Sequence, residues 1–546
     1  MPLTGVLRLG RPSDIWFKPA LSVVASVAPP NLLLLALGRL DLAMYTMAGS
    51  LCALYAHNCP YAARARTLAL VILGMTGGLA AALTTASLTT DTAVLVAVGA
   101  VLAAAQKALC DATRIGPPGN VVLAFISSAA LFAPQTLAQV PGHLAWALAA
   151  GAWAWLVGMA PGLLRPHGPE RRATAHALNA AAAHAATLGT GEHQARTRAA
   201  AAAAVQAAWQ TLTATGPRSA ATRRALEALL VRAEVALAAP ADADPRQMRR
   251  WARELCGTGP VPHAADLPGT ADELLGVDIE LAEPRTPLLR RLGGQTPIAV
   301  RTALGCALAG YASLALGVGR PYWALVTAAA LYQANVTLTW SRGVQRVVGN
   351  LIGVLVFAAV APLAHLSQAV LVLLCLAFNF GAEALIGRNY WLGTVCVTPM
   401  ALLITEFAHV QDPGRLVTQR VVDTLVGALA GFVAAVAVTN RRAGDRVEHA
   451  LRAAERAREH AARLLAGPAP APAGLESARR ALAAALAALR AATDAAAGEW
   501  WQRALPHERV VLAEQAGHRT LAATARRLGL GRGPDPVART TEEPRP

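Results

Sequence analysis

The feature that most limits how this chain can fold is a series of long apolar runs, repeated along much of its 546 residues. The longest runs approach the roughly 17–25 residues that a helix needs to cross a bilayer. Their continuity excludes barrel strands, in which apolar and polar residues alternate. Only 15% of the residues are charged, against about 25% in an average soluble domain. The chain is therefore predicted to be an all-α, polytopic membrane protein.

The apolar runs fall into two groups of six, and a polar segment follows each group. A local repeat supports a duplication, because Leu54-Tyr55 and the Leu331-Tyr332 pair each precede two arginines and a Gly-containing run. About twelve spans in two six-helix bundles are predicted, with two cytoplasmic helical domains. The predicted domains are a first bundle over 1–160, a polar helical domain over 161–291, a second bundle over 292–440, a second polar helical domain over 441–530 and a disordered tail over 531–546.

Basic residues alternate between the loops that connect the runs. Arg64 and Arg165 lie in basic loops, whereas the loop at 87–91 has no lysine or arginine. Basic loops remain in the cytoplasm, so both termini and both polar segments are predicted to face the cytoplasm across the cell membrane. The aromatic pair Tyr322 and Trp323 is predicted to lie at the outer interface. The net charge of +16 then reflects topology and contact with anionic lipids, with no nucleic acid as partner.

The most informative stretch is Arg320–Asn350, which reads "RPYWALVTAAALYQANVTLTWSRGVQRVVGN". Its first run is predicted to cross inward to about Thr337, and Ser341 is predicted to cap a new helix. Arg342, Arg346 and Asn350 then recur at four-residue intervals on one helix face. Guanidinium groups at the positive end of a helix dipole attract anions. The candidate substrate-binding residues are Arg342, Arg346, Asn350, Gln333, Asn335, Arg64 and Arg66.

Structural roles remain open for the first two of these arginines. Arg342 and Arg346 could extend to lipid phosphates or pair with Glu383 on a neighbouring span. On the adjoining face of the same helix, Gly349 and Gly353 form a stripe of small residues. Such a stripe predicts the close approach of another helix.

The last run begins with "RVVDTLVGALAG" and contains a second charged pair. Arg420 and Asp423 are three residues apart, so a structural ion pair on one helix face is predicted. An acidic group inside a membrane is also a candidate for proton coupling. Gly427 and Gly431 again predict close helix packing.

Sequence motifs for enzymes and cofactors are missing from the chain. No Gly-rich phosphate loop, nucleophile–base set or metal-binding helix pair is present. We therefore predict no catalytic residue, no metal and no cofactor, and we expect that the protein is not an enzyme.

Three stretches resemble the FUSC family, the fusaric acid resistance and aromatic acid exporter group, to which plant aluminium-activated malate transporters are more distantly related. The stretches are "RPYWALVTAAALYQANVTLTWSRGVQRVVGNLIG", "NYWLGTVCVTPMALL" and "RVVDTLVGALAG". Ala334 and Asn350 stand where the family pattern has Pro and Thr. The residues that match the family pattern are Tyr322, Trp323, Gln333, Arg346 and Gly349.

The resemblance implies export of organic, often aromatic, carboxylate anions. In this hypothesis, arginines at the cytoplasmic mouths of the two halves gather the anion, and a path between the halves carries it outward. The expected partners are the organic anion and membrane lipids, and a homo-oligomer is left open. The alternative is a membrane-anchored scaffold or regulator that acts through its cytoplasmic helical domains. A membrane enzyme is a third, weaker alternative, because catalytic motifs are missing. Polar residues deep in the runs, such as Arg346 and Asp423, favour transport over anchoring.

Overall fold

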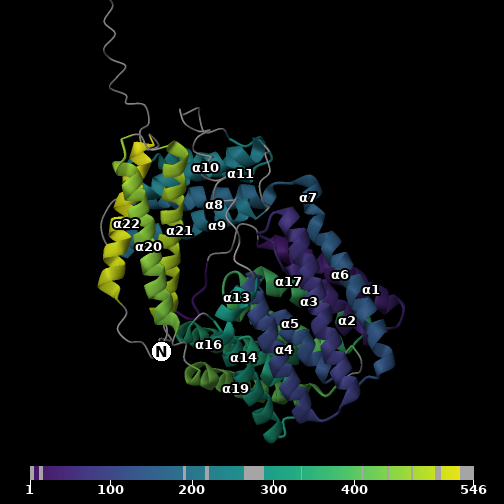
Figure 1. Cartoon of the computed structure of the whole chain (residues 1–546). Coiled ribbons are helices and arrows are strands. Elements are labelled where there is room, and N and C mark those ends of the chain that lie inside the picture. The colour runs from purple at the N-terminus through teal and green to yellow at the C-terminus, as the bar shows by residue number, and fades with distance from the viewer. Residues whose placement is uncertain are drawn as a thin grey trace, which may run out of the picture.

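The computed structural model describes residues 5–10, 16–187, 192–214, 221–262, 288–333, 335–407, 411–438, 442–468, 471–497 and 506–528. Within these ranges the chain forms helices and no strand, which confirms the predicted all-α class. The predicted disordered tail lies outside the described residues. The helices form an apolar body and a polar body, and Figure 1 shows the polar body on one side of the apolar body.

The first half of the apolar body contains six helical segments in the order long, short, long, long, short, long. They are α1 (Phe17–Ala36), the combined segment η1, α2 and η2 (Leu40–Leu54), α3 (Tyr61–Leu88), α4 (Thr92–Thr113), α5 (Val121–Leu131) and α6 (Val140–Met159).

The second half repeats this order of lengths. Its segments are α14 (Thr296–Ala315), α15 (Pro321–Ala329), α16 (Val336–Ala364), α17 (Gln368–Ile386), α18 (Tyr390–Thr405) and α19 (Pro413–Ala437). Contacts between the halves are reciprocal, because α14 packs on α4 while the corresponding α1 packs on α17. The shared order and the reciprocal contacts support the duplication that the sequence indicates.

Eight helices in the described ranges are long and apolar enough to cross a membrane. The other four predicted spans form shorter helices. The nine residues of α15, for example, cover only about 14 Å of the roughly 30 Å apolar layer. The chain therefore supports eight spans by length and composition, and the prediction of twelve is not confirmed.

The short helices explain why the Leu-Tyr pairs recur. Helix α15 ends at Ala329, not near Thr337, and the following Tyr332 is buried and donates a hydrogen bond to the carbonyl of Gly431 at 3.1 Å. In the first half, Tyr55 follows η2 and donates to the carbonyl of Gly119 at 2.6 Å. Each half thus joins a short helix to a long one through a buried tyrosine. Irregular backbone inside the apolar body is tolerated where protein surrounds it.

The start of α16 differs from the prediction. Asn335 is the N-cap, and its side-chain oxygen accepts from the backbone N–H of Leu338 at 2.8 Å. Ser341 lies inside the helix, so Arg342 and Arg346 belong to its second and third turns. The helix dipole acts mainly within the first turn. The prediction that these arginines lie at the positive end of the helix dipole was therefore wrong.

The two predicted stripes of small residues allow close helix packing, as expected. A Cβ atom added at Gly353 would lie 2.7 Å from Cβ of Thr398 on α18. A Cβ atom added at Gly431 would lie 2.8 Å from Leu331, just beyond α15. Both distances are shorter than ordinary van der Waals contact, so these glycines set the spacing of α16 from α18 and of α19 from the α15 region.

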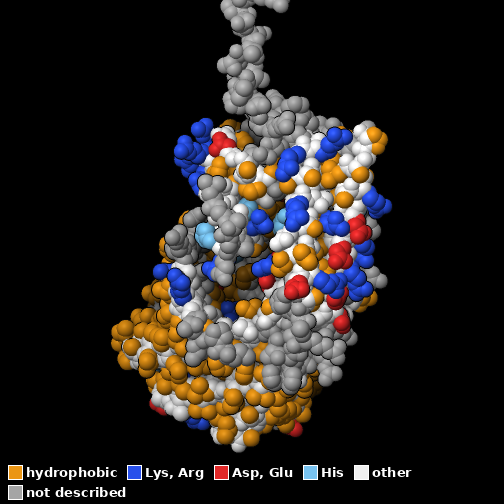
Figure 2. Space-filling model, turned by 90° about the vertical axis from the view of Figure 1, so that its left-hand side faces the viewer, with side chains coloured by type: hydrophobic (Ala, Val, Ile, Leu, Met, Phe, Trp, Pro, Cys, Tyr) orange, Lys and Arg blue, Asp and Glu red, His pale blue; other side chains and the backbone are white. Residues whose placement is uncertain are grey.

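The polar body consists of two groups of helices that pack on each other. The first group is α8 (Gly168–Ala185), α9 (Glu192–Thr213), α10 (Ala221–Ala238) and α11 (Pro245–Cys256), and the second is α20 (Arg442–Ala466), α21 (Pro472–Ala497) and α22 (His507–Arg527). Figure 2 shows charged side chains over this body and hydrophobic side chains over the apolar body.

A buried ion cluster joins the two groups of polar helices. Arg479 of α21 pairs with Glu234 of α10 at 2.7 Å and with Glu476 of its own helix at 2.6 Å. Trp209 of α9 donates to Glu234 at 2.9 Å. The two polar segments, which are far apart in the sequence, therefore form one packed unit.

Candidate functional site: a buried arginine cluster in the second half

A buried polar cluster lies in the second half of the apolar body. Its main members are Arg346 and Asn350 on α16 and Arg420 and Asp423 on α19, each at most 3% exposed. Asn350 is the fifteenth of the 29 residues of α16, and Asp423 is the eleventh of the 25 residues of α19. The cluster therefore lies near the middle of both helices, where transporters commonly bind their substrates.

Asn350 on α16 connects this helix to α18 and α19. Its side-chain oxygen accepts from the hydroxyl of Thr398 at 2.7 Å and from Nη2 of Arg420 at 3.0 Å. Its amide nitrogen donates to the carbonyl of Arg346 at 3.0 Å. These hydrogen bonds link Asn350 to Arg346 on its own helix, to Thr398 on α18 and to Arg420 on α19.

Tyr390 at the start of α18 contacts both arginines of α16. Nη1 of Arg346 donates to its hydroxyl at 2.9 Å, while the guanidinium carbon of Arg342 lies 3.3 Å from its ring centroid. Arg346 is buried and Arg342 is partly exposed. Within the described ranges neither arginine pairs with Glu383, so that structural role of the arginines is not observed.

Arg420 and Asp423 have different partners. Asp423 accepts from the hydroxyl of Ser313 on α14 at 2.5 Å, and the Arg420 guanidinium lies 4.0 Å from the ring centroid of Trp323 on α15. In the part of the chain that the structure describes, the two residues form no ion pair with each other. The predicted ion pair was therefore wrong, because neighbouring helices supply a partner for each group.

Several polar atoms of the cluster are buried without a hydrogen-bond partner. They are Nε of Arg346, Nε and Nη1 of Arg420 and Oδ2 of Asp423. A buried donor without an acceptor is destabilising by about 1–3 kcal/mol, and more when it carries charge. With two guanidinium groups and one carboxylate, the cluster has donors and an excess of positive charge suited to an anion that brings acceptor oxygens.

Aromatic side chains border the cluster on the side of the first half. The rings of Trp323 and Phe125 are 5.8 Å apart, those of Tyr322 and Trp323 are 4.7 Å apart, and those of Phe132 and Tyr322 are 5.8 Å apart. Tyr322 and Trp323 are both buried by other helices, so they do not form the lipid-facing aromatic belt that is expected at an interface. They provide flat apolar surfaces beside the Arg420 guanidinium.

A basic cavity of about 430 Å³ lies where α4 and α14 meet α20 and α21. Among the predicted binding residues, Gln333 lines it. Asp111 also lines it but is paired with Lys107 at 3.1 Å. The cationic residues that line the cavity are Lys107, Arg114, Arg301 and Arg446. Such a cavity concentrates anions next to the apolar body.

The remaining predicted residues are not brought to the cluster. Asn335 caps α16 and donates to the carbonyl of Asp494 on α21 at 3.4 Å, which is a structural role. Arg64 is buried and contacts the ring of His57 at 3.2 Å, whereas Arg66 is exposed on α3. The buried arginine cluster belongs to the second half alone. The sequence hypothesis instead places anion-gathering arginines in both halves.

A buried polar pair in the first half is neutral. Gln106 of α4 donates to Ser127 of α5 at 2.8 Å, and both are buried. The two halves therefore share an architecture but differ in charge. Across the described residues, no group of three His, Cys, Asp or Glu side chains is placed to hold a metal ion.

The part of the chain that contains the cluster is similar in sequence to a known protein family. Residues 307–434 match a protein family described as "Fusaric acid resistance protein-like", which confirms the resemblance over this segment. A similar curated protein is the "Uncharacterized membrane protein YvaC" of Bacillus subtilis (strain 168), with 32% identity over 143 residues. The alignment covers 26% of this chain and 22% of YvaC. No solved structure matches the chain. The second half is thus a membrane region similar to fusaric acid resistance proteins.

Proposed function

We propose that the protein is a membrane transporter that exports organic carboxylate anions, with aromatic carboxylates as its substrate class. The observation that carries this proposal is the buried cluster around Arg346 and Arg420, in which guanidinium N–H groups have no acceptor. A helix that only anchors the protein has no use for such groups in its middle, because each is destabilising there.

The substrate class follows from the surroundings of Arg420. A carboxylate accepts charge-assisted N–H bonds from guanidinium groups, and Nε and Nη1 of Arg420 are each available as a donor. Trp323 and Tyr322 lie beside it and can contact the ring of an aromatic acid. An aromatic carboxylate would thus satisfy the buried donors with one end and pack against apolar rings with the other.

Arg346 and Arg342 have separate roles in this proposal. Arg346 is buried and has a free Nε, so it binds the anion together with Arg420. Arg342 lies over the ring of Tyr390, whose hydroxyl accepts from Arg346. Arg342 therefore positions Tyr390 and adds positive charge near the site. The basic cavity that includes Gln333 would collect anions from the side of the polar body.

Transport into and out of proteoliposomes tests the proposal. The initial uptake rate of a panel of aromatic and aliphatic carboxylates is measured with the wild-type protein and with Arg420→Gln. Hydrogen bonds to charged groups contribute about 1.5–3 kcal/mol, so the variant should raise the half-saturating concentration by about tenfold or more. Arg415→Gln is the matched control, because Arg415 is exposed on the same helix.

The outcome also distinguishes the competing function. Arg415→Gln should transport as the wild type does. If folded wild-type protein moved none of these anions, or if Arg420→Gln kept wild-type saturation, transport through this site would be refuted. A scaffold or regulator acting through the packed polar helices would then account better for the chain.

A further inference from the structure

A second cluster of cations lies outside the transport site, at the junction between the apolar and polar bodies. Lys18 lies at the start of α1, Arg165 follows α7 (Pro161–Leu164), and Arg172 lies on α8. A Cβ atom added at Gly168 would lie 3.6 Å from Cβ of Arg165 and 3.9 Å from Nη2 of Arg172, so these arginines are neighbours. Lys18 is within electrostatic range of both.

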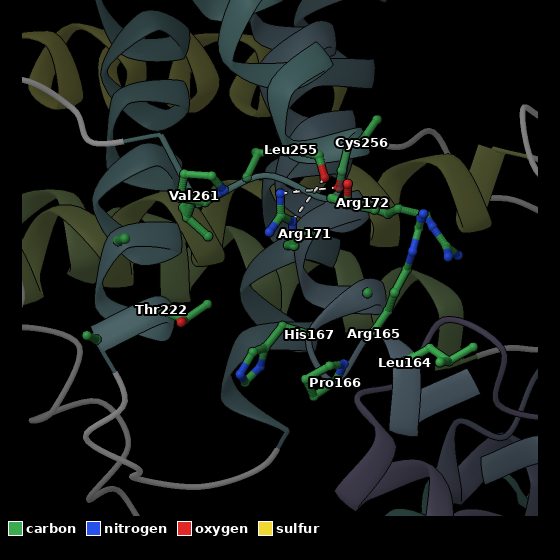
Figure 3. A pocket seen from close by; sticks show the side chains of 16 residues that line it. Leu164, Arg165, Pro166, His167, Arg171, Arg172, Thr222, Leu255, Cys256 and Val261 are labelled. Atoms are coloured by element: carbon green, nitrogen blue, oxygen red, sulfur yellow. Dashed lines mark hydrogen bonds between the residues drawn. The ribbon is translucent and has the colours of Figure 1, made fainter. Parts of the chain in front are cut away.

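These three cations have no acidic partner in the described part of the chain. The nearby Arg171 has a structural role, because it donates to the backbone carbonyls of Leu255, Glu254 and Gly257 at the end of α11. Figure 3 shows Arg165 and Arg172 extending to the same side, away from the carbonyl groups that Arg171 contacts. Two guanidinium groups and one ammonium group are thus available to an external anion.

The cluster borders a cavity and two exposed leucines. The cavity has a volume of about 410 Å³ and is lined by Arg165, Arg172 and Thr222, among others. Leu163 and Leu164 of α7 are 89% and 87% exposed. A Cβ atom added at Gly162 would lie 2.9 Å from Cγ of Tyr61, so α7 packs closely against the start of α3. Exposed leucines next to cations at the end of a membrane helix are typical of a protein segment at the lipid headgroup level.

We propose that Lys18, Arg165 and Arg172 bind the phosphate group of an anionic phospholipid whose acyl chains lie along Leu163 and Leu164. Guanidinium groups bind phosphate oxygens through paired, charge-assisted hydrogen bonds. Basic pockets beside membrane helices bind anionic lipid headgroups. The leucines make a lipid the favoured source of the phosphate over a free phosphate ion. This site is separate from the buried arginine cluster and does not depend on transport.

Lipid binding to the purified full-length protein in detergent tests the proposal. Affinity is measured for labelled phosphatidylglycerol, for phosphatidylcholine and for inorganic phosphate, at low and high salt. The wild type should prefer phosphatidylglycerol and lose affinity as salt rises. Arg165→Gln with Arg172→Gln should weaken phosphatidylglycerol binding by about 25-fold, or about fivefold for each charge removed.

Two further double variants test whether position and acyl chains matter as well as charge. Arg249→Gln with Arg250→Gln removes the same charge from exposed positions on α11 and should leave lipid binding unchanged. Leu163→Ser with Leu164→Ser should weaken lipid binding while leaving phosphate binding unaffected.

Three results would overturn the assignment. The first is equal wild-type affinity for phosphatidylglycerol and phosphatidylcholine, which needs no variant to observe. The second is unchanged lipid binding in the folded double arginine variant. The third is tight binding of inorganic phosphate with no effect of the leucine variant, which would identify a site for free phosphate.

Discussion

An added methyl group at Gly349 should disrupt the arginine cluster without touching any of its polar residues. A Cβ atom at this position would lie 2.6 Å from the carbonyl oxygen of Trp391 and 2.7 Å from Cβ of Thr394, both on α18. Ordinary contacts begin near 3.4 Å. Gly349→Ala therefore requires α16 and α18 to separate by roughly 1 Å at this point.

The separation should lengthen the hydrogen bonds that α18 makes to the cluster. Tyr390 lies 2.9 Å from Arg346, and Thr398 lies 2.7 Å from Asn350. A displacement of about 1 Å takes such bonds past the range in which they contribute. Overpacking costs about 1–3 kcal/mol, and the loss of each hydrogen bond adds about 1 kcal/mol. Gly349→Ala should lower both the thermal unfolding midpoint and the affinity for an aromatic carboxylate.

Gly77→Ala is the matched control for this substitution. Gly77 lies on α3, the counterpart of α16 in the first half, and a Cβ atom added there meets no atom within 4 Å. Alanine at an open helix position is neutral or stabilises by about 0.5–1 kcal/mol. Thermal unfolding and equilibrium binding of both variants in detergent provide the measurement. If Gly349→Ala matched Gly77→Ala in both assays, the close α16–α18 contact would be refuted.

Three further predictions concern the polar body. Arg479→Met should leave the buried carboxylates of Glu234 and Glu476 unpaired and lower the free energy of unfolding in urea by about 3–5 kcal/mol. Replacing both glutamates by glutamine in the same protein should recover much of this loss. Wild-type stability of Arg479→Met alone would show that the ion pairs are not formed. Burial, with the charges of Arg198 and a neighbouring histidine, lowers the pKa of His518 to about 4. The neutral imidazole therefore contributes its full stability above the unfolded pKa near 6.5. Below that pH the free energy of unfolding should fall by about 1.4 kcal/mol per pH unit down to about pH 4. A pH-independent difference in unfolding free energy between wild type and His518→Gln would contradict this. Cys256 is exposed on the polar body. If this body is cytoplasmic, a membrane-impermeant maleimide should label Cys256 only in opened cells. Labelling of intact cells that disappears in Cys256→Ser would show that the topology is reversed.

The sequence is most informative where a local pattern determines the structure. The repeated Leu-Tyr pairs predict a duplication, and Tyr55 and Tyr332 occupy the same place between a short and a long helix. Gly349 and Gly353 predict a close helix contact, because small residues at four-residue spacing leave room on one helix face. These features depend on neighbours in the chain, which a single sequence displays.

The wrong predictions concern places where distant segments decide the outcome. Asn335 and Ser341 are both suitable N-cap residues, and in the structure the Asn335 side chain caps α16, whereas Ser341 lies inside the helix. Arg420 and Asp423 have a spacing that allows an ion pair on an isolated helix, but Asn350 and Ser313 come from other helices and provide alternative partners. A single sequence does not reveal such partners.

The basic cavity is not predicted from the sequence, for a related reason. Lys107 and Arg114 by themselves indicate only topology, because basic residues accumulate at cytoplasmic helix ends. Their meeting with Arg446 requires α4 to lie next to α20, a contact between residues more than 300 positions apart. The cationic residues are visible in the sequence, but the cavity they share is not.

Direct binding of an aromatic carboxylate to the purified protein tests the proposed anion site most closely. Isothermal titration with benzoate would compare the wild type with Arg346→Gln, Arg420→Gln and Arg420→Lys at low and high salt. We predict that each glutamine variant loses about tenfold or more in affinity at both salt concentrations, because buried charges are little screened. Lysine should restore only part of the affinity, since an ammonium group cannot reproduce the fixed planar set of donors of a guanidinium group. Wild-type affinity in both folded glutamine variants would contradict the assignment of the buried arginine cluster as the anion site.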